Sequence, residues 1–147
     1  YLESYKWFHL NRVVRFGDTD AAGVIHFVQC LRWCHESWEE SLDLFGLSAH
    51  EVFPSINQSG KDPEILLPIV HCEADFLKPI KIGDRLSIVI LPRRIDSGSF
   101  NITTTFFCDN LKVAIGLLRH LSIQGESRQR SDLPLLIERW LEASSMD

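Results

Sequence analysis

The spacing of hydrophobic positions changes along this chain from a helical period to an extended one. Between Phe27 and Phe45, apolar side chains recur every three or four residues, which places them on one face of a helix. That face is formed by Phe27, Leu31, Cys34, Trp38, Leu42 and Phe45. Gly46 follows directly, where a left-handed residue commonly closes a helix. The pattern predicts a helix of about 18 residues whose apolar stripe packs against a sheet.

From Ile69 onward, apolar and polar residues alternate, which is the period of a β-strand. Segments 69–77, 86–90, 100–106 and 113–123 show this alternation, and turn sequences such as Gly83-Asp84 and Asp109-Asn110 separate them. A further strand is predicted before the helix, at residues 11–16. Short turns between successive strands favour an antiparallel meander.

The remaining segments complete the predicted order of elements. Residues 48–51 have the capping-box pattern of a short helix, and residues 54–64 read as a loop. A last helix is predicted after Asp132, with Pro134 in its first turn. An antiparallel sheet with helices segregated to one side belongs to the α+β class. With 147 residues, the chain fits a single domain, 1–147.

Composition excludes several classes of function. The net charge of −5 argues against a nucleic-acid-binding protein, which would carry a basic surplus. No apolar run approaches the roughly 18–20 residues that cross a bilayer, so we expect no membrane partner. The cysteines, Cys30, Cys34, Cys72 and Cys108, form no CxxC pair and are typical of reduced thiols in a cytoplasmic protein.

Residues 15–24, with the sequence RFGDTDAAGV, are the best candidates for chemistry. Asp18 and Asp20 lie between a predicted strand and a predicted helix, and small residues follow them. The unpaired N–H groups of a helix N-terminus can stabilise an oxyanion, and a nearby carboxylate can attack an acyl carbonyl or activate water. Aspartates in such loops also serve as caps or turn residues, and the residues alone leave both interpretations open.

The run FGDTDAAGVIHF is similar to the FGDxDxAGxxxF signature of the 4-hydroxybenzoyl-CoA thioesterase family. This resemblance implies a hotdog fold, in which an antiparallel sheet wraps around a long central helix. It assigns the catalytic carboxylate, as nucleophile or general base, to Asp20, and the backbone N–H that polarises the thioester carbonyl to Phe27. Many members have proline after the catalytic aspartate. Ala21 replaces it here, which loosens the turn slightly.

The same resemblance implies the partners of the site. The substrate would be an acyl-CoA, hydrolysed without metal or organic cofactor. By their position in the chain, Gly23 lets the substrate approach the backbone closely, and His26, next to Phe27, fits either a hydrogen bond to the acyl group or a structural role. Family members carry basic residues near one hairpin that contact the phosphates of coenzyme A. Here Arg93 and Arg94 are the candidates, with Arg128 and Arg130 as weaker ones. Members form homo-oligomers, as dimers or tetramers, with each site built across two subunits.

A narrower resemblance concerns the acyl group. The segments GDTDAAGVIHF, RWCHESWEESL, LPIVHCEADF and RWLEAS resemble the 1,4-dihydroxy-2-naphthoyl-CoA thioesterases of phylloquinone biosynthesis in cyanobacteria. The alternatives are a thioesterase for hydroxybenzoyl-CoA or another acyl-CoA, and a non-catalytic acyl-CoA-binding protein. Retention of Asp20 within its motif speaks against the last of these.

Competing motifs are incomplete. The chain has no G-x-S-x-G nucleophile elbow, and the sequence after His35-Glu36 lacks the second histidine of a zinc motif. His26, Cys30 and Cys34 share a helical face, but a structural zinc site needs four converging ligands, so core packing is the better interpretation. His71 fits either a pocket or a subunit contact, and His120 reads as an ordinary sheet position.

Overall fold

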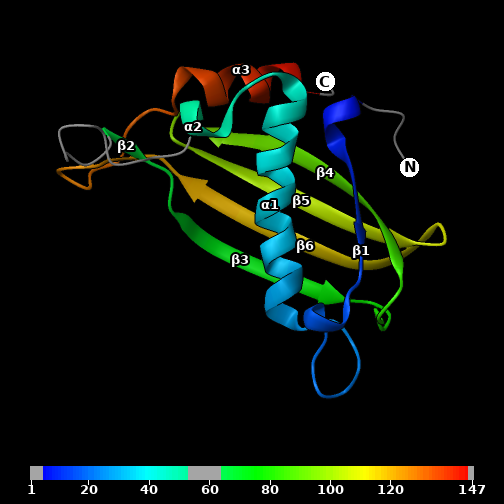
Figure 1. Cartoon of the computed structure of the whole chain (residues 1–147). Helices are drawn as coiled ribbons and strands as arrows, with labels where there is room; N and C mark the ends of the chain where they lie inside the picture. The colour runs from blue at the N-terminus through cyan, green and yellow to red at the C-terminus, as the bar shows by residue number, and fades with distance from the viewer. Residues whose placement is uncertain (1–4, 53–63, 146–147) are drawn as a thin grey trace.

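A five-stranded antiparallel sheet packs against one long helix, α1 (Phe27–Phe45), which lies across one of its faces (Figure 1). The computed structural model describes residues 5–52 and 64–145. The strands of the sheet are β1 (His9–Val13), β3 (Ile69–Phe76), β4 (Arg85–Asp96), β5 (Ser99–Cys108) and β6 (Leu111–Leu121). The shorter elements are η1 (Lys6–Phe8), η2 (Phe16–Asp18), α2 (Ala49–Val52), β2 (Ile65–Leu66), β7 (Ile123–Gln124) and α3 (Leu135–Ala143). The predicted α+β class is confirmed.

The long helix ends as predicted but buries a different set of side chains at its start. Gly46 adopts φ 108°, and its N–H donates to the carbonyls of Leu42 and Asp43. Phe27, which we predicted on the buried face, is 61% exposed. It belongs to the first turn, which projects toward a pocket rather than the sheet. The buried face instead includes Trp33 together with two serines, Ser37 and Ser41.

The predicted meander is correct for β4, β5 and β6 and wrong for β3. The strand order is β1-β4-β5-β6-β3, so β3 pairs with β6 at one edge of the sheet. The chain must then pass β6 and β5 to reach the position of β4. The connection at residues 77–84 makes this crossing because its partners lie in the N-terminal region. Ile25 N–H donates to Ile80 O at 2.7 Å, and Val14 N–H donates to Asp84 O at 2.9 Å.

Two other expectations change, and one is not tested. The first strand begins two residues earlier than predicted and ends at Val13, because a 3-10 turn, η2, follows it. The small sheet formed by β2 and β7 was not predicted, since two-residue strands show no alternation. The predicted loop at residues 54–64 lies, apart from Glu64, outside the described residues. The short helix α2 and the last helix α3 were both predicted.

The ends of the described chain are tied together by indole donors. Trp140 Nε1–H donates to Ser41 Oγ at 3.1 Å, which joins α3 to α1. Trp7 Nε1–H donates to Ser144 Oγ at 3.0 Å, which joins the first residues to the last helix. His120 lies on β6, as a sheet position predicts, but it is also internal: it is 1% exposed and stacks on Phe100, which the sequence did not indicate.

Candidate active site

Asp18 closes the base of the loop that carries the candidate chemistry. Its carboxylate oxygen Oδ2 accepts a hydrogen bond from Arg15 N–H at 2.8 Å. Its main-chain carbonyl accepts one from His26 N–H, also at 2.8 Å. Both ends of the loop at residues 15–26 are therefore anchored to one residue. This carboxylate has the capping role that aspartate commonly plays in such loops.

Asp20 lies inside the loop and is exposed. Its Oδ1 accepts a hydrogen bond from Ala22 N–H at 2.8 Å, which sets the direction of the carboxylate. Its main chain is held on both sides, because Asp20 N–H donates to Val24 O at 2.8 Å and Gly23 N–H donates to Asp20 O at 3.0 Å. Gly23 adopts φ 80°, a backbone conformation that residues other than glycine rarely adopt. The second oxygen, Oδ2, takes part in no hydrogen bond with another described residue.

His26 caps the helix that follows the loop. Its ring nitrogen Nδ1 accepts a hydrogen bond from Val28 N–H at 3.2 Å, so the neutral ring carries its proton on Nε2. The N–H of Phe27, the first residue of α1, donates to no other described residue. It points out of a helix N-terminus, where the partial positive charge of the helix dipole is concentrated.

The loop and the helix start form one side of a pocket of about 420 Å³. Asp20, Val24, Ile25 and Phe27 line this side. The opposite side consists of residues 76–80, at the end of β3 and the start of the crossing connection. Sequence analysis missed this second wall, because residues 69–77 read only as a strand and gave no sign of facing a cavity. The wall is mostly apolar, as is typical of a pocket that binds a small molecule.

Asp20 and Phe27 are the two predicted residues that the structure brings to one cavity. A carboxylate and an unused backbone N–H on the same pocket can act on the carbon and the oxygen of a single carbonyl group. Gly23 and His26 belong to the same loop but do not line this pocket. Their contact with substrate stays a prediction. His71 is exposed on β3, with Nε2 3.4 Å from Glu73 Oε1.

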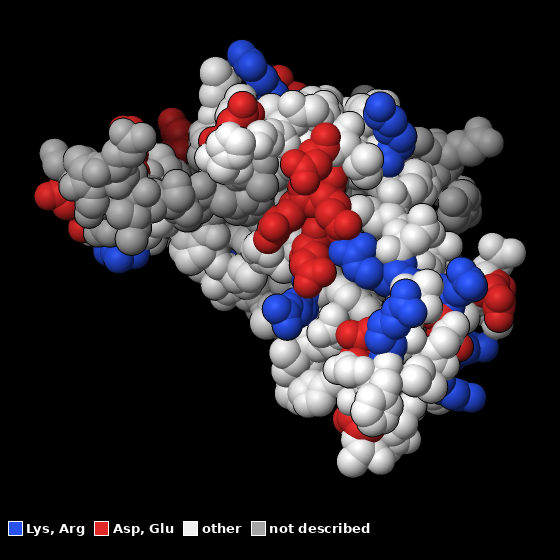
Figure 2. All heavy atoms as spheres, viewed as in Figure 1, with Lys and Arg blue, Asp and Glu red and all other residues white. Residues whose placement is uncertain are grey.

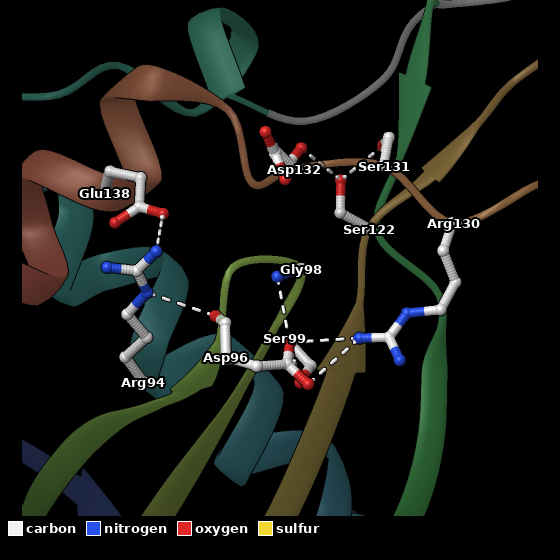
Figure 3. Close-up of polar contacts among 9 residues, drawn as sticks. All are labelled: Arg94, Asp96, Gly98, Ser99, Ser122, Arg130, Ser131, Asp132 and Glu138. Carbon is white, nitrogen blue, oxygen red and sulfur yellow. Dashed lines mark hydrogen bonds and ion pairs between the residues drawn. The ribbon is translucent and has the colours of Figure 1, made fainter.

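Arg94 and Arg130, two of the predicted phosphate ligands, are engaged elsewhere (Figure 3). Arg94 pairs with Glu138 of α3 at 3.0 Å, and Arg130 pairs with Asp96 at 3.0 Å. The Gly98 N–H, the Ser99 hydroxyl and Arg130 together lower the pKa of Asp96 to about 2, so this carboxylate stays ionised. Arg93 and Arg128 have no ion-pair partner among the described residues.

Arg93 lies near the end of β4. It is eight residues beyond Arg85, the first residue of this strand, and a strand rises about 3.3 Å per residue, so roughly 26 Å separates the two arginines. The pocket-lining residues 76–80 precede Arg85, at the opposite end of the strand from Arg93.

The outer face of α1 carries acidic side chains, which appear as a red stripe in Figure 2. Glu36, Glu39, Glu40 and Asp43 all lie on this helix. Arg12 pairs with Glu36 and Glu40, and its pKa is raised by these carboxylates despite partial burial, which acts in the opposite direction. Negative charge along this face disfavours the binding of phosphates there.

The cysteine pair of the helix lies in the core and not at a metal centre. Cys30 and Cys34 are fully buried, whereas His26 is exposed at the helix start. Contact with Cys30 and burial both raise the pKa of Cys34, which keeps that thiol protonated. Within residues 5–52 and 64–145, no cluster of three metal-ligating side chains occurs. No helix in these segments is both long and apolar enough to span a bilayer.

Proteins of similar sequence have closely similar length. The chain is 57% identical over 140 residues to a 1,4-dihydroxy-2-naphthoyl-CoA hydrolase of Prochlorococcus marinus strain SARG, covering 95% of this chain and 90% of that protein. It is 54% identical over 142 residues to a protein of the same name from Synechococcus sp. strain WH7803, covering 97% and 93%. These relatives match almost the whole chain, including the loop at residues 15–26.

Solved structures show the same arrangement. A protein from Prochlorococcus marinus strain MIT 9313 superposes with a TM-score of 0.89 at 52% identity, covering 95% of this chain and 96% of the other. A 1,4-dihydroxy-2-naphthoyl-CoA thioesterase from Synechocystis superposes with a TM-score of 0.80 at 29% identity, covering 91% and 94%. The hotdog fold that the motif implied is thereby confirmed. Residues 14–141 match the Thioesterase-like superfamily, and the chain belongs to that family.

Proposed function

We propose that this protein is a single-domain enzyme that hydrolyses 1,4-dihydroxy-2-naphthoyl-CoA to 1,4-dihydroxy-2-naphthoate and coenzyme A, a step of phylloquinone (vitamin K1) biosynthesis. One observation carries the proposal. Asp20 and the first turn of α1 line the same mostly apolar pocket, in a chain 57% identical to a hydrolase of that name. The pocket suits an aromatic acyl group, and the carboxylate supplies the reacting group that hydrolysis needs.

Asp20 is the catalytic residue in either of two routes. As a nucleophile, its free Oδ2 attacks the thioester carbon, the C–S bond breaks, the thiolate of coenzyme A leaves, and water then hydrolyses the mixed anhydride. As a general base, it takes a proton from a water molecule that attacks the same carbon. In both routes the carbonyl oxygen gains negative charge, which the Phe27 N–H and the helix dipole stabilise.

The enzyme assembles as a homo-oligomer through β3. This strand lies at the edge of the sheet, and its apolar residues Val70 and Phe76 are 51% and 45% exposed. A long, exposed and partly apolar edge strand is a ready site for pairing with another strand, and a second copy of the chain offers the same strand. Because β3 ends at residue 76, which lines the pocket, such pairing places the pocket at a subunit boundary.

Arg93 binds the phosphates of coenzyme A from a neighbouring subunit. Arg93 lies toward the end of β4 that is remote in sequence from the pocket-lining residues 76–80, and its guanidinium forms no ion pair in the described part of the chain. Arginine is well suited to phosphate, because it forms paired hydrogen bonds with oxyanions. Arg94, held by Glu138, supports the hairpin instead.

The cytoplasm is the proposed location. All four cysteines are free. Free thiols persist best where glutathione and thioredoxin keep thiols reduced.

The test is hydrolysis by the purified protein, followed as release of the coenzyme A thiol. The kcat/KM value for 1,4-dihydroxy-2-naphthoyl-CoA should exceed those for 4-hydroxybenzoyl-CoA and palmitoyl-CoA by about ten-fold or more, since the larger ring system buries more apolar area than a single ring. If either competitor matches the naphthoyl substrate, the substrate assignment falls and the thioesterase activity stands. If no thioester is hydrolysed, the enzyme assignment falls.

A further inference from the structure

The pocket beside Asp20 contains one described side chain that can donate a hydrogen bond. Asp20 itself only accepts hydrogen bonds when it is ionised. Apart from Asp20 and Lys78, every side chain that lines the pocket is apolar. Among the described residues, the ammonium group of Lys78 is therefore the one polar side-chain donor that a substrate in this pocket can meet.

The backbone of Lys78 is fixed relative to Asp20. Leu77 N–H and Lys78 N–H both donate to Val113 O, at 2.9 and 3.2 Å, which anchors the segment to the start of β6. Pro79 follows and restricts the backbone further. Two residues on, Ile80 O accepts the hydrogen bond of Ile25 N–H at 2.7 Å, so this segment is joined to the loop that carries Asp20.

The ammonium group of Lys78 forms no ion pair among the described residues. Arg12, Arg94 and Arg130 each form an ion pair with a carboxylate. Lys78 forms none with any residue in the described part of the chain, and its side chain is exposed on the pocket side of the crossing connection. A lysine stem can lie along an apolar wall while its ammonium group reaches a polar partner.

The size of the pocket indicates which part of the substrate Lys78 meets. Lys78 and Asp20 line the same pocket of about 420 Å³, so both face the same part of a bound thioester. The pyrophosphate lies roughly 14 Å from the sulfur along the extended pantetheine arm. With the thioester carbon at Asp20, the substrate oxygen atoms in this region are those of the acyl group and of the nearer pantetheine amide.

A hydrogen-bond donor at this position would let the pocket select between acyl rings with and without a hydroxyl group. An apolar pocket barely distinguishes an acyl ring that carries a hydroxyl group from one that does not, whereas a positioned hydrogen-bonding group discriminates strongly. We propose that Lys78 is a specificity-determining residue that donates a hydrogen bond to a ring hydroxyl oxygen of the acyl group. This inference rests on the proposed thioesterase function and adds the residue that recognises the hydroxylated ring.

The test compares Lys78→Met with the wild-type enzyme on 1,4-dihydroxy-2-naphthoyl-CoA and on 2-naphthoyl-CoA. Methionine keeps an unbranched apolar stem and removes the ammonium group. The kcat/KM value for the dihydroxy substrate should fall at least about ten-fold, the usual effect of losing a hydrogen bond with a charged donor. The value for 2-naphthoyl-CoA should change less than about three-fold, because that ring has no hydroxyl group.

Lys81→Met is the matched control. Lys81 lies three residues further along, is exposed, and does not line the pocket. Its substitution should leave the ratio between the two substrates unchanged. Pantetheine thioesters of both acyl groups complete the design, because they lack the pyrophosphate and the nucleotide.

Two results would overturn the inference. An equal loss on both CoA substrates that disappears with the pantetheine thioesters would mean that Lys78 binds phosphate. An equal loss that persists with the pantetheine thioesters, or no loss on any substrate, would mean that Lys78 recognises neither the ring hydroxyl groups nor the phosphates. If the wild type hydrolyses nothing, the proposed function fails, and the inference is then tested by dissociation constants of the nonhydrolysable thioether analogues. Lys78→Met must weaken the dihydroxynaphthyl analogue selectively.

Discussion

The sulfur atom of Cys34 occupies the space beside Gly116 in which a side chain would begin. Cys34 lies on α1 and Gly116 on β6, and both are buried. Beyond the sulfur, the nearest atoms to a Cβ at this position are Cys34 Cβ and Glu73 O, both at 3.8 Å, an ordinary contact distance. The close approach of helix and sheet at this point thus depends on one absent side chain.

Gly116→Ala should therefore destabilise the protein by about 1–3 kcal/mol, the usual cost of overpacking a core. Cys34→Ala removes the clashing sulfur, so the double variant should lose less stability than the two single variants predict when summed. Urea unfolding of the four proteins measures this coupling. Additive losses would show that the two residues are not in contact.

Asp20→Asn should lower kcat by at least about 10²-fold while the fold is retained, because the amide is neither a nucleophile nor a base. Asp18→Asn is the matched control. Its amide oxygen can still accept the Arg15 N–H bond, so the loop keeps its anchor and activity stays near normal. Steady-state hydrolysis and circular dichroism check both variants. An inactive Asp18→Asn beside an active Asp20→Asn would exchange the two assignments.

Arg93→Ala should raise KM for the CoA thioester more than it lowers kcat, and the defect should shrink for the pantetheine thioester, which has no pyrophosphate. Arg94→Ala should have a smaller effect on KM, since Arg94 is paired with Glu138. Kinetic constants for both substrates separate the two residues. An equal defect of Arg93→Ala on full and truncated substrates would remove it from the phosphate site.

Mixed oligomers test whether Arg93 acts across subunits. Subunits carrying Asp20→Asn and subunits carrying Arg93→Ala should form hybrid sites in which an intact Asp20 meets an intact Arg93. Such sites should show the KM of the wild type, even though neither parent does. If the mixture shows only the raised KM of Arg93→Ala, the arginine acts within its own chain.

Acid should destabilise the fold through His120. Burial is the main cause that lowers the pKa of His120 to about 4 from 6.5, and the charge of His35 acts in the same direction, against the hydrogen bond to Leu67 O. As the pH falls, His120 is therefore protonated in the unfolded chain at a higher pH than in the folded protein. The stability from a neutral His120 is complete above about pH 6.5 and is lost as the pH falls toward 4, by at most about 1.4 kcal/mol per pH unit.

His120→Gln should flatten this dependence, because glutamine does not titrate and can still donate a hydrogen bond to Leu67 O. The measurement is the free energy of unfolding in urea at pH 7, 6 and 5 for both proteins. An identical slope in the two would show that other groups cause the acid sensitivity.

A positive charge at the middle of β3 should dissociate the oligomer into monomers. Cys72 is exposed on this edge strand, and Cys72→Lys would place an ammonium group against the same strand of another copy. Sedimentation should then show monomers. Leu111→Lys adds the same charge at a residue that is 54% exposed and should leave the assembly intact. An undisturbed oligomer in Cys72→Lys would place the interface elsewhere.

The sequence predicts most elements of the fold but not the position of every strand in the sheet. The spacing from Phe27 to Phe45 matches the helix end to end, since local periodicity and a C-terminal glycine are both visible along the chain. The position of β3 is not visible in that way. Gly83-Asp84 resembles a hairpin turn, yet the chain crosses the sheet before it, and the bond from Ile25 N–H to Ile80 O that guides the crossing joins distant residues.

The candidate site was predictable only on one side. The motif at residues 15–24 points to Asp20 and the start of α1 through its similarity to the FGDxDxAGxxxF signature, because aspartates in such loops are otherwise ordinary cap residues. Lys78 gave no signal, since a lysine at the end of a strand looks like any solvated residue. The burial of His120 was equally hidden, because an alternating strand does not reveal which histidine meets the helix.

The order of the strands also bears on how the chain folds. β4, β5 and β6 join through short hairpins, whereas His9 pairs with Val89 and Cys72 pairs with Leu118 across long stretches of chain. Contacts between distant residues form more slowly, because a long loop must close before they are made. The pocket lies where the Asp20 loop meets the crossing connection, and both belong to these late segments. During refolding, hydrolytic activity should consequently return after the central hairpins have formed, as the last property the chain acquires.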